Sequence, residues 1–205
     1  DENGGLTVHK VPSTPADPSI AAVSGMQEIL AMTGCPATSV TELLHGSTIA
    51  ANALIQRRGA RMALITTLGF RDVLFIQRQD KSSVYDMFYQ KPAPLIGRDA
   101  AFEIEERMDA QGCVVTPLSD DDIHRLVDEI ANGFRAQSVA VCLLHAYANP
   151  AHEQRIAQAF AARHPDIRVS LSSVVSPEHR EYERTSTTVI DTYIGPAVDR
   201  YLTRF

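Results

Sequence analysis

The sequence predicts an α/β fold with a mainly parallel or mixed sheet and helices on both faces. Three short apolar runs, at 62–65, 138–144 and 167–171, have the length and composition of strands that are covered on both faces. Helical patterns separate them, as after Ser119, where apolar residues recur at every third or fourth position. Such an alternation of strands and helices is typical of domains with a parallel sheet.

The N-terminal quarter is predicted to hold a strand, a helix and the end of a second strand. Leu6–Val11 is the first expected strand, and the apolar residues at 40–44 are expected to end the second. Asp17 before Pro18 is typical of a helix start, because an N-cap carboxylate accepts from free N–H groups and proline fits the first helical position. Gly34 is expected to close this helix.

The next segment joins a hydroxyl-bearing turn to a short helix and a buried strand. Gly46, Ser47 and Thr48 can cap a helix that begins near Ile49. The free backbone N–H groups at a helix start attract anions, so the same turn can bind a phosphate or a carboxylate beside the sheet. Many strand-to-helix turns carry these residues as caps alone, and the pattern leaves both interpretations open.

The rest of the chain is partly irregular and partly periodic. Residues 71–98 carry few signals apart from a short amphipathic piece at Val73–Ile76. Within them, 85–98 is either a boundary between two subdomains or a surface excursion. The elements expected afterwards are a strand pair at Ala101–Arg107 and Cys113–Thr116, a helix between Ser119 and Gly133, a strand at Ser138–Leu144, a helix between Asn149 and His164, a strand at Ile167–Leu171 and a long helix after Pro177.

Composition argues against several classes of protein. The 205 residues carry a net charge of −6 with no basic stripe, which argues against a nucleic-acid-binding protein. No apolar run approaches the roughly 18–20 residues of a membrane span. Cys35, Cys113 and Cys142 are far apart and lack metal-ligand spacing, which indicates reduced thiols in a cytoplasmic protein.

A family resemblance adds to this reading. Residues 45–72 read HGSTIAANALIQRRGARMALITTLGFRD. This stretch resembles the HG[ST]T-x-A-x-NAL-x-x-R-x-GA-x-x-ALITT-x-GF-x-D signature of the hydantoinase A/5-oxoprolinase family, which includes N-methylhydantoinases, oxoprolinases and acetone or acetophenone carboxylases. Further matches follow in family order over essentially the whole chain: Ile76–Gln79, Lys91–Leu95, Glu106–Gly112, Cys142–Glu153 and Glu181–Thr188.

The resemblance implies that residues 1–205 are the N-terminal region of a larger protein. Its fold would be a fragment of the actin-like ATPase type, shared by acetate and sugar kinases, a heat-shock chaperone and actin, with an inserted subdomain. Larger family members begin with a D-x-GGT-x-TD loop that resembles the first phosphate loop of that superfamily. This sequence opens at Asp1–Gly5, where that hairpin would turn back, and stops at Tyr201–Phe205 inside a helical pattern. We therefore expect a piece truncated at both ends that cannot turn over substrate by itself.

The activity that the resemblance implies is ATP-dependent hydrolysis of a cyclic amide. A lactam or hydantoin would be phosphorylated on its amide oxygen before water opens the ring. ATP and Mg would serve the full-length enzyme, with neither expected bound to this piece and no metal ligand expected in it. The expected partners are the cyclic-amide substrate, the remainder of the chain and a hydantoinase B-type partner subunit or domain.

Two other functions are compatible with the same sequence. ATP-dependent ketone carboxylases of the acetone or acetophenone type share the motifs, so a carboxylase subunit is the alternative enzyme. The second possibility is a non-catalytic assembly module. It is suggested by an apolar stripe on the last helix that would be left partly uncovered, formed by Val189, Tyr193, Ala197 and Tyr201.

His45 and Arg184 are the candidate catalytic residues. His45 precedes the glycine turn and can polarise a substrate oxygen or transfer a proton, although a hydrogen-bonded structural histidine fits equally well. Arg184 precedes four hydroxyl residues near a helix start, where a guanidinium and hydroxyls can bind phosphate. The alternative is a solvated helix face on which Arg184 pairs with Glu181 or Glu183.

Further residues are candidates for binding substrate or phosphate. Asn52 can hydrogen-bond an amide or cap its helix, and His145 follows a buried strand at the edge where α/β sheets bind ligands. The full candidate set is Gly46, Ser47, Thr48, Asn52, His145, Thr185, Ser186, Thr187 and Thr188. Because phosphoryl transfer needs several donors around a developing charge, we expect Gly46–Thr48 and Arg184–Thr188 to converge on one cleft.

Overall fold

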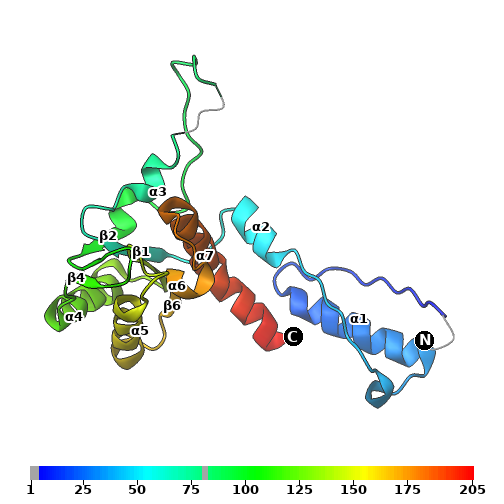
Figure 1. Ribbon diagram of the computed structural model, residues 1–205. Coiled ribbons are helices and arrows are strands. Elements are labelled where there is room, and N and C mark those ends of the chain that lie inside the picture. Colours follow the sequence, from blue (N-terminus) through cyan, green and yellow to red (C-terminus); the bar gives the residue numbers. More distant parts are fainter. Residues whose placement is uncertain (1–4, 80–82) are drawn as a thin grey trace. The chain divides into compact units, whose positions relative to one another are not determined.

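A computed structural model describes residues 5–79 and 83–205 (Figure 1). The expected hairpin turn at Asp1–Gly5 therefore lies almost wholly outside the described residues. The chain divides into two compact units, a smaller one of Asp1–Ala53 with Ala197–Phe205 and a larger one of Leu54–Pro196. Residues 85–98 lie inside the larger unit, so this division does not fall at the subdomain boundary suggested there.

The larger unit contains a four-stranded sheet in which every pairing is parallel, in the order β2-β1-β5-β6. Leu64 of β1 lies opposite Ala101 of β2 on one side and Ala140 of β5 on the other. All six residues of β1 are buried, as a strand covered on both faces requires. The strands are β1 (Met62–Thr67), β2 (Ala101–Ile104), β5 (Ser138–Cys142) and β6 (Arg168–Leu171). This arrangement confirms the α/β prediction.

Helices cover both faces of this sheet. On one face α4 (Asp120–Asp128) and α5 (Ala151–Arg163) pack their apolar residues against β1 and β5, with Phe160 and Ile156 fully buried. On the other face, Val189 and Tyr193 of α7 (Glu181–Arg204) pack against β1 (Figure 1). The remaining helical elements of this unit are α3 (Val73–Ile76), η2 (Arg98–Ala100), the π-helical turn η3 (Glu129–Phe134) and α6 (Ser172–Val175).

The strand pair expected at Ala101–Arg107 and Cys113–Thr116 is only partly correct. Ala101–Ile104 does not pair with the second predicted strand. It pairs with β1 as the edge strand of the main sheet, where its Ala101 and Ile104 side chains are buried in the core. The hairpin itself is short and pairs β3 (Arg107–Met108) with β4 (Val114–Thr116) in antiparallel fashion.

The smaller unit is built around α1 (Pro18–Thr33). The Asp17 carboxylate accepts from the backbone N–H of Ser19 at 3.2 Å, and Gly34 ends the helix with a left-handed φ of 64°, both as predicted. A short turn η1 (Ala37–Ser39) follows, and α2 (Ile49–Ile55) begins in this unit. The strands expected at Leu6–Val11 and before His45 are wrong, because these described segments are irregular and lie in no sheet. An apolar pattern does not make a strand without a neighbour that completes its hydrogen bonds.

Three of the four residues of the stripe on α7 are covered, and Ala197 is half-buried. Val189, Tyr193 and Tyr201 are at most 8% exposed. Tyr193 packs in the larger unit against Gly59, whose neighbour Ala60 donates its N–H to the Tyr193 carbonyl at 3.0 Å. Tyr201 packs in the smaller unit. The observation that favoured an assembly module is therefore weakened.

Pro196 lies inside α7 and changes the hydrogen bonds of the helix. Proline has no N–H, so the carbonyl of Thr192, one turn earlier, receives no bond from position 196. The hydroxyl of Ser138, at the start of β5, donates to this carbonyl at 3.0 Å in a fully buried environment. Strand and helix are thus joined at the point where the helix ladder is incomplete.

Among the described helices, none is both long enough and apolar enough to cross a membrane.

We predict that Gly59→Ala destabilises the protein. A Cβ at position 59 would overlap the Tyr193 ring, so either the ring or the strand connection must move, at a cost of about 1–3 kcal/mol. Gly133→Ala is the matched control, because a Cβ there meets no atom within 4 Å. Urea unfolding of both variants checks this prediction, and equal midpoints would contradict it.

Candidate functional site

The carboxyl edge of the sheet is the natural place for a ligand. The chain passes from β1 to β2 on one side and then to β5 on the other, so the strand order reverses between β1 and β5. Open parallel sheets bind ligands beyond the carboxyl ends of the strands at such a point. In this protein the segments leaving that edge begin at Leu68 after β1 and Leu143 after β5.

A pocket of about 340 Å³ lies at this edge. Most of its wall is apolar, and its polar groups include Arg107, His145 and Gln77. Its lining residues are Phe70, Val73, Ile76, Gln77, Arg107, Leu144, His145, Glu181 and Tyr182. An apolar cavity of this size with a few convergent polar groups suits a small organic molecule.

Two of the polar groups are held by ring contacts. The guanidinium of Arg107 lies 5.1 Å from the centre of the Phe70 ring, in cation–π contact. His145 is half-buried, and its Nδ1 lies 3.2 Å from the hydroxyl of Tyr147. Arg107, His145 and the Glu181 carboxylate therefore line one largely apolar pocket. Arg107 and His145 can donate to an oxygen that carries partial negative charge, which the Glu181 carboxylate opposes. The prediction that His145 lies at the carboxyl edge is confirmed, while its binding role stays a prediction.

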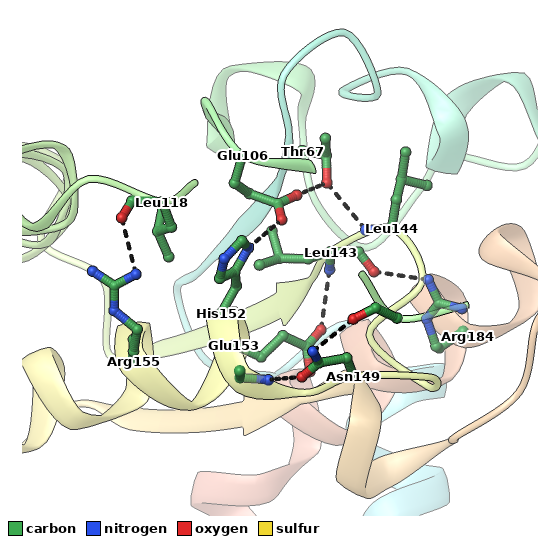
Figure 2. Close-up of polar contacts among 12 residues, drawn as sticks. Thr67, Glu106, Leu118, Leu143, Leu144, Asn149, His152, Glu153, Arg155 and Arg184 are labelled. Carbon is green, nitrogen blue, oxygen red and sulfur yellow. Dashed lines mark hydrogen bonds and ion pairs between the residues drawn. The ribbon is translucent and has the colours of Figure 1, made fainter. Parts of the chain in front are cut away.

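A buried chain of hydrogen bonds joins the ends of three strands and includes Leu144, which also lines the pocket (Figure 2). The hydroxyl of Thr67 accepts from the N–H of Leu144 at 3.0 Å and donates to Oε1 of Glu106. The second oxygen of Glu106 lies 2.7 Å from Nδ1 of His152 on α5. All three side chains are at most 6% exposed, so the network is shielded from water.

A second buried carboxylate, that of Glu153, binds the backbone of Leu143, the residue before Leu144. It accepts from the N–H of Leu143 at 3.0 Å, from the hydroxyl of Ser172 at 2.6 Å, and from the N–H and hydroxyl of Ser173 at 2.9 and 2.7 Å. Burial raises the pKa of Glu153, although these donors oppose the shift. The side chain ties the turn after β5 to the start of α6. Figure 2 shows its bond to Leu143.

Arg184 is buried, with 1% exposure, and its guanidinium binds the backbone. It donates to the carbonyl of Glu178 at 2.7 Å and lies 5.5 Å from the centre of the Tyr147 ring. It also donates to the carbonyl of Leu143 at 2.9 Å (Figure 2). The expected alternative, a solvated pairing with Glu181 or Glu183, is wrong: Glu183 pairs with Arg78, whose guanidinium holds the pKa of Glu183 below its usual range. These contacts give Arg184 a structural task, and its catalytic role stays a prediction.

The hydroxyl residues after Arg184 do not act as one set. The hydroxyl of Thr188 donates to the Arg184 carbonyl at 2.7 Å, inside the helix. Thr185 is buried, Ser186 is half-buried and Thr187 is exposed. Their phosphate-binding role stays a prediction, although the Thr188 proton is already engaged.

The N-terminal motif lies in the smaller unit, where it caps α2. The hydroxyl of Ser47 accepts from the N–H of Ile49 at 3.3 Å, and the Asn52 side chain donates to Thr48 Oγ1 at 3.2 Å. Gly46 is exposed, in an irregular segment. These contacts agree with capping, and the expected ligand contacts of Gly46–Thr48 stay a prediction.

His45 has aromatic partners. Its Nε2 lies 2.7 Å from the Tyr201 hydroxyl, and its ring stacks on Phe205 with centroids 4.3 Å apart. These contacts fit the structural alternative for His45. Because Gly46–Thr48 and Arg184–Thr188 belong to different units, the expected convergence of the two motifs also stays a prediction.

Several residues of the site were not among the candidates. Arg107 lines the pocket, and Thr67, Glu106, His152 and Glu153 form the buried hydrogen bonds beside it, but none of the five was proposed to bind a ligand. The available signal was their position within the blocks that carry the family resemblance, together with polar character beside apolar runs.

Comparison with known proteins places these observations in a family. The family model described as "Hydantoinase/oxoprolinase N-terminal region" matches residues 1–163. The chain belongs to the hydantoinase/oxoprolinase family. Its predicted membership is thereby confirmed.

Individual members of the hydantoinase/oxoprolinase family match nearly the whole chain. An uncharacterized protein of Methanocaldococcus jannaschii is 36% identical over 97% of this chain and 29% of its own length. The acetophenone carboxylase gamma subunit of Aromatoleum aromaticum is 32% identical over 94% of this chain and 28% of its own length. The crystal structure of ATP-dependent caprolactamase from Pseudomonas jessenii has a TM-score of 0.86 and 33% identity, over 100% of this chain and 30% of that one. The chain thus spans about 30% of the length of these hydantoinase/oxoprolinase relatives.

Mg²⁺ is one of the groups that the family resemblance implies for the complete enzyme. Among residues 5–79 and 83–205, no group of three or more His, Cys, Asp or Glu side chains is placed to hold a metal ion. We therefore assign none of these residues to the metal and derive no step through it.

We predict that the Cys142 thiol is inert in the folded protein. Burial raises its pKa to about 12, and the Glu153 carboxylate adds to the shift, so the reactive thiolate is scarce. Cys113 is exposed and serves as the internal control. At about pH 8, iodoacetamide should modify Cys113 in the native state and Cys142 only after denaturant is added. Peptide mass spectrometry checks this, and equal labelling of both thiols would contradict it.

Proposed function

We propose that this chain is the N-terminal region of an ATP-dependent cyclic-amide hydrolase of the hydantoinase/5-oxoprolinase type. The complete enzyme would phosphorylate the amide oxygen of a lactam or hydantoin and then open the ring with water. The observation that carries this proposal is the likeness to the ATP-dependent caprolactamase over the full length of the chain, at 33% identity and a TM-score of 0.86.

The pocket supports a small cyclic amide as the ligand. Phe70, Val73 and Ile76 offer apolar surface for the ring carbons of a lactam. Arg107 and His145 offer donors for its amide oxygen, which gains negative charge as the carbonyl is activated. Preorganised donors in a largely apolar pocket stabilise such charge more than water does, because they need no reorganisation during the reaction.

The task of this region is therefore to bind and orient the amide. ATP, when bound in the complete enzyme, supplies the phosphoryl group that turns the amide oxygen into a leaving group. Most of the Mg²⁺–phosphate clamp would come from other parts of the enzyme, and the hydroxyl residues after Arg184 would add donors to it. A hydantoinase B-type partner subunit or domain would assemble with it, and the subunit name of the acetophenone carboxylase relative supports this part of the proposal.

A ketone carboxylase is the second candidate. The likeness to the acetophenone carboxylase gamma subunit, at 32% identity over 94% of this chain, favours it specifically. A ketone also presents a carbonyl oxygen and apolar carbon to the pocket, so the lining residues suit both substrate classes. The difference lies in which carbonyl compound stimulates ATP hydrolysis.

A substrate panel decides between these activities. We expect the complete enzyme, prepared with its partner subunit, to hydrolyse ATP faster with 5-oxoproline, hydantoin, N-methylhydantoin or caprolactam than without substrate, by about 10-fold or more. Acetone or acetophenone with bicarbonate serves as the comparison. Stimulation by the ketones alone would replace the hydrolase with the carboxylase, and stimulation by neither class would refute both.

The 205-residue chain alone should bind MgATP weakly. Its sequence contains neither the D-x-GGT-x-TD loop nor a GxxxxGK[ST] phosphate loop, so the triphosphate lacks a cradle of backbone N–H groups. Isothermal titration should give a Kd weaker than about 1 mM, equivalent to roughly −4 kcal/mol. Micromolar binding of MgATP to this chain would contradict the expectation.

A further inference from the structure

We propose that Thr67 is a positioning residue for the candidate site, acting through the turn that carries His145. This inference rests on the proposed function, in which His145 contacts the substrate carbonyl. Thr67 itself is 2% exposed and does not line the pocket, so any influence on the ligand has to pass through the residues that it holds.

The turn after β5 is held from three directions. Glu153 on α5 accepts the N–H of Leu143, and Arg184 on α7 donates to the carbonyl of the same residue. Thr67, at the end of β1, accepts the N–H of Leu144. Three buried polar side chains from three elements thus fix two successive peptide units immediately before His145 (Figure 2).

His145 needs this support because its backbone is strained. Its φ is +57°, in the left-handed region that residues other than glycine seldom occupy. Such a conformation is unfavourable for a residue with a Cβ and persists when the surroundings hold it. The His145 carbonyl accepts from the N–H of Ala148 at 2.9 Å, which closes the turn from the other side. The imidazole thereby stays at the pocket wall beside Leu144.

The polarity of the hydrogen bonds makes the Thr67 hydroxyl hard to replace. A backbone N–H can only donate, so the Thr67 oxygen accepts from Leu144 and its single proton goes to Glu106. Glu106 is the acceptor in this bond, and its other oxygen is engaged by His152. Loss of the hydroxyl leaves the Leu144 N–H unpaired in a buried site and removes one partner of the Glu106 carboxylate.

Two substitutions separate the hydroxyl from the shape of the side chain. Thr67→Val keeps the volume and branching of threonine but has no hydroxyl, whereas Thr67→Ser keeps the hydroxyl and loses one methyl group. Small displacements of a reacting group can cost about 100-fold in rate. In the complete enzyme we expect Thr67→Val to lower kcat by about 10- to 100-fold with little change in KM, and Thr67→Ser to keep kcat within about 3-fold.

A double-mutant cycle tests whether Thr67 acts through His145. If it does, Thr67→Val should cause little further loss of kcat in a His145→Ala background. If Thr67→Val lowers kcat by the same factor in the His145→Ala background as in the wild type, the proposal is overturned. Equal kcat values for the valine and serine variants would overturn it as well. Should the valine variant fail to fold, Thr67→Cys, with its weaker acceptor, takes its place in the same cycle.

Hydrogen exchange separates this inference from the proposed function. In the 205-residue chain, Thr67→Val should speed exchange of the Leu144 amide and move the His145 ring signals in the NMR spectrum, while Thr67→Ser does neither. Amides of Ile123 and Val127 on α4 serve as controls for general loosening. If the wild-type enzyme is inactive on the whole substrate panel but Thr67→Val still changes Leu144 exchange and the His145 signals, the proposed function is refuted. The positioning of the turn by Thr67 then stands. Unchanged Leu144 exchange in the valine variant would refute the positioning of the turn by Thr67, whatever the enzyme's activity.

Discussion

The placement of β1 between β2 and β5 is the constraint on which the larger unit depends. Because these strands run parallel, their carboxyl ends share one edge, and the chain must return to the opposite edge after each strand. Both faces of β1 are buried, so helices have to lie on each of them. The same geometry gathers polar residues from distant parts of the chain at the shared edge. Thr67, Glu106 and Leu144 come within hydrogen-bonding distance for this reason.

The sequence predicted those helices and strands whose own residues mark them, by capping residues at the ends or by an apolar run. The helix between Asp17 and Gly34 begins after an N-cap residue and ends at a C-cap glycine, and the structure confirms both ends. The buried strand β1 was predicted from its apolar run alone. The segment Ala101–Ile104 was assigned to the wrong partner, because a strand's composition does not specify its neighbour and the nearest turn favoured a hairpin. Pairing is a property of the whole sheet.

The site was predicted in outline and missed in detail. The rule that parallel sheets bind ligands at their carboxyl ends was enough to select His145. Arg184 was predicted to bind a ligand because four hydroxyl residues follow it near a helix start. Its guanidinium instead binds the carbonyl of Leu143, 41 residues away, which no local pattern reveals. Thr67 and Glu106 are 39 residues apart, so no spacing within either segment reveals their bond. Polar residues that hold a site therefore become visible only when the strands are placed side by side.

The bond between Ser138 and the Thr192 carbonyl couples the residue at position 138 to the residue at position 196. With proline at 196, that carbonyl lacks the N–H that a residue at 196 normally donates, and the hydroxyl at 138 donates to it instead. If Pro196 were replaced by a residue with an N–H, the helix could satisfy the carbonyl itself, and alanine would become acceptable at 138. Conversely, loss of Ser138 while Pro196 remains leaves a buried acceptor unpaired. The effect of a substitution at position 138 therefore depends on the residue at position 196.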